Sequence, residues 1–483
     1  MKVLRSRRLA GLAGCAVLAL SVAGTAAAGP AQAQAWDQVR AAAAVAPPPD
    51  VASWGLNNAG QLGDGTTTSR PRFVDVRAGT SVVQVAAGWA LQFGHGLEAR
   101  SDGTAWAWGG NGFGELGDGT TDSRLSPVQV TGLTGVTQVA GGCIHSLALR
   151  SDGTVWAWGG NRFGELGRGT VTDHEVTPAP VAGLAGVVKI AAGCEYSLAV
   201  RSDGTVWAWG ANPVGELGTG GTASSAVPVK ITGVSQVTGI AAGWDSAVAV
   251  VAGGASVWAW GGNDAGQLGD GTLAGRTTPV RVTQIGTVHI AGVGVGFKYA
   301  AILGTDGSVW AWGADTRGQL GNAPVATPVT RPVHTIGAGS GITQIAVGAS
   351  HMVALKSDGT VLAWGDNTNG ELGNGTTTSV TGPVQVTGLT GATQVAAGLR
   401  AGFAVHVPLP VPPVPDLTGD TKPQAGQVLQ AAGLVLGAVT QAPEKDCAHL
   451  GLVISQTPAA GTAVFPGSAV SITIGGPPAN GCR

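Results

Sequence analysis

The sequence predicts an all-β protein whose main domain is a seven-bladed β-propeller with four-stranded blades. The first observation is a stretch, typified by residues 155–167 (VWAWGGNRFGELG), that recurs seven times at intervals of 50 to 54 residues. The second is that each copy ends in Gly-(Gln/Glu)-Leu-Gly, and five copies follow an Asp-Gly pair that signals a tight hairpin. The third is that no helical period fits these repeats. Repeats of about 50 residues favour a propeller over a linear β-solenoid, whose rungs are usually nearer 20–30 residues.

Each unit contains four short strand candidates, which we call A to D in chain order. Typical examples are residues 137–142 for A, 146–149 for B, 155–159 for C and 127–130 for D. The alanines and glycines of strand A allow seven inner strands to crowd a central axis. Trp156 and Trp158 lie two residues apart in strand C, so they share one face of the strand. We expect such tryptophans to pack between neighbouring blades.

The repeats begin and end in the middle of a blade. Residues 51–54 match strand C and residues 72–76 match strand D, whereas residues 394–398 match strand A and residues 402–407 match strand B. We expect these four segments to share one blade, because a ring closed in this way has no free sheet edges.

Three motifs in these units resemble the regulator of chromosome condensation (RCC) repeat, which forms seven-bladed propellers. They are the W-G-x-N-x-x-G-(Q/E)-L-G run, the Q-V-A-A-G-x-x-H-S-L-A-L run and the S-D-G-T-V turn. The resemblance covers about residues 51–407 and recurs in all seven units. It implies the fold more directly than the function, since one fold supports many functions.

The first 35 residues have the pattern of a signal peptide. Four basic residues precede an apolar run over residues 9–23, and small-x-small cleavage sites follow at 31–33 and 33–35. The pattern predicts a secreted or cell-wall-associated protein. Lipid anchoring at Cys15 is the less favoured alternative, because much of the apolar run lies after that cysteine. Residues 36–50 form an Ala/Pro-rich lead-in, and no other apolar run reaches the roughly 18 residues that a membrane span needs.

A second, smaller domain is expected over residues 414–483, after a proline-rich linker at 408–413. Thr421, Lys422 and Pro423 signal a helix start, Gly433 signals its end, and strand candidates follow at 434–440, 451–457 and 468–474. The runs at 414–419, 432–434, 453–462 and 467–470 resemble a PASTA domain. This small α+β family occurs outside bacterial cells, and the resemblance implies contact with peptidoglycan or muropeptides.

Four cysteines remain once the leader is removed, an even number that suggests disulfides in an exported chain. Cys447 and Cys482 flank the last two strands of the small domain, and we expect them to be bonded. Cys143 and Cys194 occupy equivalent positions in consecutive units. Their pairing stays open, because such inner positions are roughly 7–10 Å apart, near or past the reach of a disulfide. No cysteine or histidine spacing indicates a metal site.

The charge balance and the motifs exclude several functions. Without its leader, the chain holds 22 basic and 28 acidic residues, a net charge of −6, which disfavours nucleic acid as a partner. No nucleophile, metalloprotease or paired-carboxylate motif is present, so we predict no enzyme, no catalytic residue and no cofactor.

A ring of loops between strands A and B is the expected binding face. The A–B and C–D loops of a blade emerge on the same side, and the A–B loops carry aromatic residues among sparse charges, as protein-binding hot spots do. The alternative is that these side chains turn into the channel mouth or between blades. The residues expected to form the ring are Trp89, Ile144, Glu195, Tyr196, Trp244, Asp245, Phe297, Lys298, Tyr299, His351 and Arg400.

Together these features predict an exported, monomeric, non-enzymatic binding protein. The propeller face would recognise an extracellular protein or a cell-wall ligand, and the PASTA-like domain would contact peptidoglycan. One alternative, implied by the RCC resemblance, is a guanine-nucleotide exchange factor, which needs a cytosolic or nuclear GTPase. A second alternative is a polysaccharide-acting enzyme, although no catalytic group is visible. The identity of the ligand does not follow from the sequence.

Overall fold

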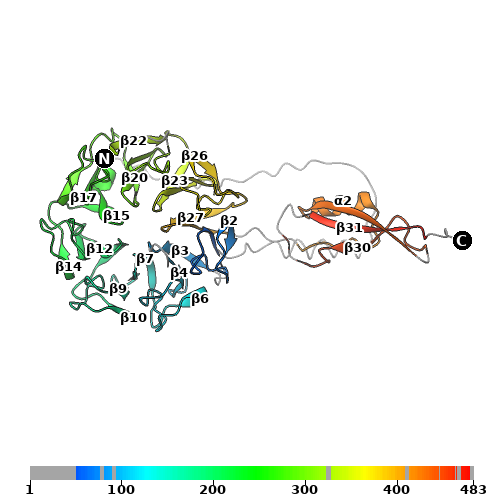
Figure 1. The fold of residues 1–483 in the computed structure, drawn as a ribbon, viewed down its shortest axis with the longest axis horizontal. Helices are drawn as coiled ribbons and strands as arrows, with labels where there is room; N and C mark the ends of the chain where they lie inside the picture. The colour runs from blue at the N-terminus through cyan, green and yellow to red at the C-terminus, as the bar shows by residue number, and fades with distance from the viewer. Residues whose placement is uncertain are drawn as a thin grey trace, which may run out of the picture. The chain divides into compact units, whose positions relative to one another are not determined.

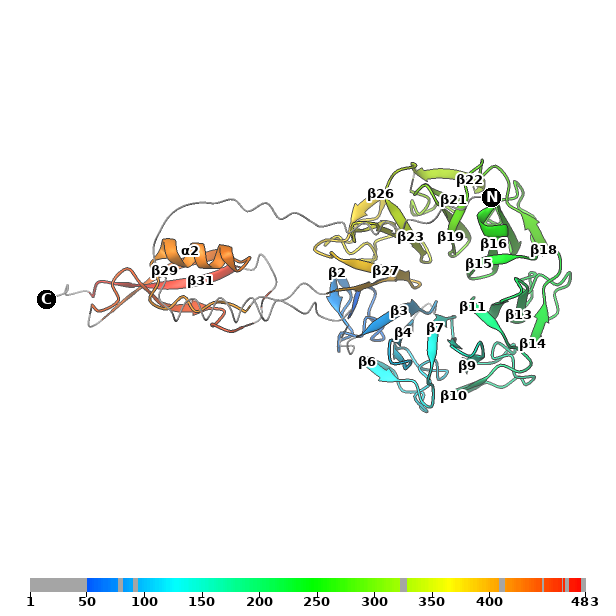
Figure 2. The same cartoon turned by 180° about the vertical axis from the view of Figure 1, so that it is seen from behind.

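A computed structural model describes residues 50–76, 81–89, 94–321, 328–407, 413–444, 447–462, 464 and 469–478. Within them, seven four-stranded antiparallel sheets surround a central axis (Figures 1 and 2). This arrangement confirms the predicted seven-bladed β-propeller. The predicted leader at 1–35, its cleavage sites and Cys15 lie outside the described residues, so they stay predictions.

Strands A to D of each blade run outward from the axis in chain order. Blade 1 consists of β3 (Val82–Ala87), β4 (His95–Arg100), β5 (Ala105–Gly109) and β6 (Arg124–Gln129). Blade 2 consists of β7 (Val136–Gly141), β8 (His145–Arg150), β9 (Val155–Gly160) and β10 (His174–Pro180). Blade 3 consists of β11 (Val187–Ala192), β12 (Tyr196–Arg201), β13 (Val206–Gly210) and β14 (Ser225–Lys230).

The next three blades repeat the pattern. Blade 4 consists of β15 (Val237–Ala242), β16 (Ser246–Val251), β17 (Ser256–Gly261) and β18 (Arg276–Arg281), with the short 3-10 turn η1 (Ala252–Gly254) in place of an Asp-Gly hairpin. Blade 5 consists of β19 (Ile290–Val295), β20 (Tyr299–Gly304), β21 (Val309–Gly313) and β22 (Val329–Ile336). Blade 6 consists of β23 (Ile342–Val347), β24 (His351–Lys356), β25 (Val361–Gly365) and β26 (Val380–Gln385).

Blade 7 closes the ring with strands from both ends of the repeat region, as predicted. Its strands lie in the order β2 (Arg70–Asp75), β1 (Asp50–Gly55), β28 (Ala401–His406) and β27 (Ala392–Ala397). The junction is the antiparallel pairing of β1 with β28, in which Val51 lies opposite Val405 and Trp54 lies opposite Gly402. The closure therefore depends on backbone hydrogen bonds between segments separated by about 350 residues in the sequence.

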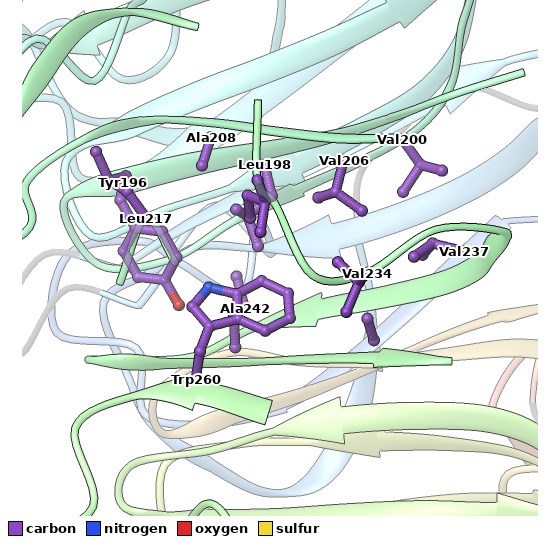
Figure 3. Close-up of a cluster of buried hydrophobic side chains, with 13 residues drawn as sticks. Tyr196, Leu198, Val200, Val206, Ala208, Leu217, Val234, Val237, Ala242 and Trp260 are labelled. Atoms are coloured by element: carbon purple, nitrogen blue, oxygen red, sulfur yellow. The ribbon is translucent and has the colours of Figure 1, made fainter. Parts of the chain in front are cut away.

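The second tryptophan of each strand C joins neighbouring blades. All seven of these side chains are fully buried: Trp54, Trp108, Trp158, Trp209, Trp260, Trp312 and Trp364. The indole of Trp158 donates to the carbonyl of Glu115 in the preceding blade, over 2.7 Å, and equivalent bonds of 2.7 to 3.2 Å occur at the other six. Figure 3 shows the cluster between blades 3 and 4, in which Leu198 and Val206 of blade 3 lie with Ala242 and Trp260 of blade 4.

The small C-terminal domain has the predicted helix and three strands. Helix α2 (Lys422–Ala431) begins at a capping box between Thr421 and Gln424, and Gly433 follows its end with a φ of 72°. The sheet has the order β29 (Val435–Pro443), β31 (Ala469–Gly476), β30 (Val453–Thr457). Its core includes Leu429 of the helix. Among the described residues, no helix is long and apolar enough to cross a membrane.

Candidate binding face at the A–B loops

The first residues of the A–B loops form an apolar cluster on the propeller axis, which we call the plug. Its buried members are Trp89, Cys143, Cys194 and Leu399, and the partly buried Ile144, Trp244 and Ala349 pack against them. The plug draws on six blades, so it fills the axis at the ends of the A strands. Backbone hydrogen bonds of 2.9 to 3.2 Å link successive blades here, for example from Cys143 N–H to the carbonyl of Cys194.

A disulfide joins Cys143 and Cys194 within the plug, which resolves the pairing that the sequence left open. The two Cα atoms lie 4.4 Å apart, so the spacing of roughly 7–10 Å expected for inner positions is wrong here. The reason is that a glycine follows strand A and allows successive loops to approach closely, at Gly142 and equally at Gly88, Gly243, Gly296 and Gly348. A Cβ on Gly142 would lie 2.6 Å from the carbonyl oxygen of Gly193. Cys482 lies outside the described residues, so its pairing with Cys447 stays a prediction.

Four residues of the expected ring are buried and do not present their side chains to solvent. Trp89 belongs to the plug, and Tyr196, Tyr299 and His351 begin strand B and lie between blades. The hydroxyl of Tyr196 donates to the carbonyl of Ser246 over 2.7 Å, and that of Tyr299 donates to the carbonyl of His351 over 2.6 Å. Burial lowers the pKa of His351 to about 4, so this imidazole is neutral at pH 7. These four side chains therefore have structural roles.

The accessible residues of the ring concentrate on blades 4 and 5. The rings of Trp244 and Phe297 meet edge to face, with centroids 5.3 Å apart, and Phe297 is 36% exposed. Lys298 lies 5.7 Å from the centroid of Phe297 and forms an ion pair with Asp264 of the neighbouring C–D loop. Asp245 accepts a hydrogen bond from Gln267 over 3.4 Å. We call Trp244, Asp245, Asp264, Phe297 and Lys298 the aromatic patch.

The carboxyl groups of the aromatic patch differ in their protonation equilibria. Burial raises the pKa of Asp245, whereas the hydrogen bond from Lys298 lowers the pKa of Asp264. Asp264 was not among the expected ring residues, although its C–D loop was expected on the same face. The remaining ring residues lie outside the patch: Arg400 is exposed, and Ile144 and Glu195 are half-buried.

The repeat units match a known family along most of the chain. The family model described as "Regulator of chromosome condensation (RCC1) repeat" matches residues 50–91, 102–149, 152–200, 203–250, 255–303, 306–355 and 358–405. The chain belongs to the RCC1 repeat family. A PASTA domain model matches residues 412–476, which confirms the second resemblance. RCC1-repeat propellers with a PASTA domain are consistent with a binding or regulatory protein.

Curated relatives share the RCC1 repeats in different contexts. The ultraviolet-B receptor UVR8 of Arabidopsis thaliana is 30% identical over 339 residues, which are 67% of this chain and 74% of that protein. The E3 ubiquitin-protein ligase HERC2 of Homo sapiens is 31% identical over 350 residues, which are 70% of this chain but 7% of that protein. The ligase name therefore describes a protein of which this chain matches a small part.

Solved structures agree with the RCC1 fold. Human WBSCR16 has a TM-score of 0.67 at 24% identity, covering 74% of this chain and 98% of that chain. Prp20p of Saccharomyces cerevisiae has a TM-score of 0.66 at 24% identity, covering 75% of this chain and 92% of that chain. At this identity, the likeness establishes the fold alone.

The long C–D loops of the RCC1 repeats are held rigidly beside the A–B loops. Asn111 accepts from Leu116 N–H over 2.9 Å and donates to the carbonyls of Thr120 and Asp122 over 3.0 and 2.9 Å. Asparagines bridge the loops in the same way at Asn57, Asn161, Asn212, Asn263 and Asn367. A rigid loop loses little entropy on binding, which suits this face to recognition. Among the described residues, no group of three acidic, histidine or cysteine side chains is placed to hold a metal.

Glu115 shows what the Gln/Glu position of the RCC1 repeat does. Its carboxylate accepts from Phe113 N–H over 2.8 Å, as the amide oxygen of Gln61 accepts from Ala59 N–H. Burial raises the pKa of Glu115 to about 7. The folded state therefore binds more protons than the unfolded state between pH 4.5 and 7, and stability is lost as the pH rises through this window.

We expect Glu115→Gln to stabilise the protein by about 1–3 kcal/mol at pH 8, because glutamine keeps the acceptor and removes the buried charge. Below pH 4.5 the difference should vanish, since the carboxyl is then neutral in both states. Denaturant unfolding of both proteins at pH 4 and pH 8 measures this difference. The buried histidines titrate in both proteins, so their contribution to the pH dependence of stability cancels in the comparison. An equal difference at both pH values would contradict the assignment.

Proposed function

We propose that this chain is an exported, non-enzymatic binding protein that recognises an extracellular protein through the A–B loop face and contacts peptidoglycan through its PASTA domain. The observation that carries the proposal is the aromatic patch. There, the partly exposed pair of Trp244 and Phe297 lies beside Lys298 and Asp264 on rigid loops. Aromatic anchors next to charges of both signs are typical of protein-binding hot spots.

Two further features support export. The basic and apolar leader with its small-x-small sites has the composition of a signal peptide. The disulfide between Cys143 and Cys194 is of a kind that persists in oxidising compartments. A guanine-nucleotide exchange factor remains the alternative, which the RCC1 repeats favour, and Prp20p, which shares the fold, binds Gsp1p and histones. Export separates the two functions, because an exchange factor requires a GTPase inside the cell.

We expect the mature protein to begin near Gln34 or Trp36 and to be found outside the producing cell. Mass spectrometry of the N-terminal peptide, in culture supernatant and in cell lysate, measures both properties. A protein that retains Met1 and stays in the lysate would argue for the exchange-factor alternative and against export.

We expect Trp244→Ala to weaken binding at the loop face by about 2 kcal/mol or more, the range of a buried aromatic anchor. The ligand is captured from culture supernatant on immobilised mature protein, and its affinity is then measured for both variants. Val83→Ala is the control, because Val83 is 53% exposed at the start of the inner strand β3, at the end remote from the A–B loop. Equal affinity for wild type and Trp244→Ala would place the binding site elsewhere.

Retention on purified peptidoglycan tests the PASTA domain separately. A chain that ends at Val407 should lose this retention and keep the ligand of the loop face. If the shortened chain is retained as well as the full chain, the PASTA domain is not the peptidoglycan contact.

A further inference from the structure

The inner strands of the propeller present a free edge to the central channel, and glutamines seal this edge in four blades. Gln84 of β3 donates to the carbonyl of Val139 in β7 over 3.0 Å and accepts from the N–H of the same residue over 2.6 Å. The side chain of the third residue of strand A thus forms hydrogen bonds with the backbone N–H and C=O of the fourth residue of the next strand A. The same pair of bonds links Gln138 to Ile190 and Gln344 to Val395, and Gln394 accepts from the N–H of Val85 over 2.8 Å.

Three consecutive blades lack this glutamine. Lys189, Gly239 and Gly292 occupy its position in blades 3, 4 and 5, in the same strand register. A lysine has no acceptor for an N–H group, and a glycine has no side chain. The channel-facing N–H and C=O groups of Ile240, Val293 and Ile345 therefore lack the paired glutamine contact that their counterparts make.

A cavity of about 300 Å³ lies where these glutamines are missing. Its lining includes Lys189, Gly239 and Gly292 together with Ile240, Val293 and Ile345. Lys189 is the one charged residue of this lining. The volume is at the lower end of the range of about 300–1,000 Å³ for small-molecule sites. The cavity lies at the third and fourth residues of the A strands, whereas the plug follows their last residues.

The channel-facing N–H and C=O groups of Ile240, Val293 and Ile345 indicate which ligand chemistry fits. A matching ligand donates to the carbonyl and accepts from the N–H of the same residue, as the glutamine carboxamide does in the other blades. A single trans secondary amide points its N–H and C=O in opposite directions, so it cannot make both bonds. A residue within an extended peptide can, because its own N–H and C=O lie along one edge, as in strand addition to a sheet.

We propose that this cavity binds a short extended peptide with a free carboxylate. A residue of the peptide pairs with the open edge of β19 at Val293, in the place that a glutamine at position 239 would fill. The carboxylate pairs with Lys189, the charged group of the lining. The site is independent of the aromatic patch, and it does not rest on the function proposed for the loop face.

Calorimetric titration of the mature protein with N-acetyl-alanyl-alanine tests the proposal, with the same peptide as its methylamide for comparison. We expect the acid to bind with a dissociation constant in the range of about 1 mM or tighter. Lys189→Ala should weaken binding of the acid by about tenfold and leave binding of the methylamide unchanged, since only the acid carries the negative charge. Absence of binding by both peptides would overturn the proposal.

Restoring the glutamines should close the site. We expect Gly239→Gln together with Gly292→Gln to weaken binding of the acid at least about tenfold, and the matched double alanine variant to change it less than about threefold. A Cβ on Gly239 would lie 3.3 Å from Val250, whereas one on Gly292 would lie 3.7 Å from Leu303. Gly239→Gln alone is the deciding variant if the double one unfolds, because position 239 faces Val293, whereas position 292 faces Ile345. Unchanged binding in a folded Gly239→Gln variant would overturn the proposal.

Discussion

Replacing Trp158 with alanine is expected to lower the free energy of unfolding by about 3–5 kcal/mol, the usual loss for a fully buried tryptophan. The side chain is 0% exposed and packs into the cluster between blades 1 and 2. Its removal leaves a cavity there, and it also removes one of two donors to the carbonyl of Glu115, since the hydroxyl of Ser146 still donates to that carbonyl over 2.8 Å. The expected loss therefore comes mainly from the cavity.

The matched control is Trp156→Ala, two residues earlier in the same strand. Trp156 is half-buried, so the loss of apolar contact should be clearly smaller. Guanidinium unfolding of the mature protein compares both variants with wild type. If Trp156→Ala lowers the free energy of unfolding as much as Trp158→Ala does, the layer of second tryptophans is not the main contact between blades.

The sequence was sufficient for the fold because its signals repeat. The spacing of the tryptophans from Trp54 to Trp364 predicts seven blades, and the positions of residues 51–54 and 402–407 within their units predict the closing blade. In the small domain, Thr421 and Gly433 mark the two ends of helix α2 correctly. Each of these inferences depends on local patterns that recur or that terminate an element.

The candidate site was predicted less well, because neighbouring residues of one loop have different surroundings. Tyr196 is the first residue of its strand B and is buried between blades. Trp244 lies in the loop, two residues before β16 begins, and is only half-buried. The pairing of Cys143 with Cys194 depends on how closely two loops approach across the axis, which no local pattern reports. The missing glutamines at Lys189, Gly239 and Gly292 are visible in the sequence, but their effect appears only when consecutive inner strands are placed side by side.

Deleting residues 392–406 is expected to abolish the closed ring and to cause aggregation. The deletion removes β27 and β28, so β1 loses the partner with which six residue pairs are in register. The edge of β1 would then be exposed, and unpaired strand edges associate with other chains. The cluster between blades 6 and 7 would also lose Ala392, Val395 and Ala404.

The control for this deletion is a chain that ends at Val407, which keeps all seven blades and lacks only the residues that follow. Light scattering and thermal melting separate the two cases. We expect the chain ending at Val407 to remain monodisperse with the melting temperature of the full propeller, whereas the deletion variant aggregates on mild heating. A deletion variant that stays monodisperse and melts unchanged would mean that the pairing of β1 with β28 does not hold the ring together, and that the remaining inter-blade tryptophans suffice.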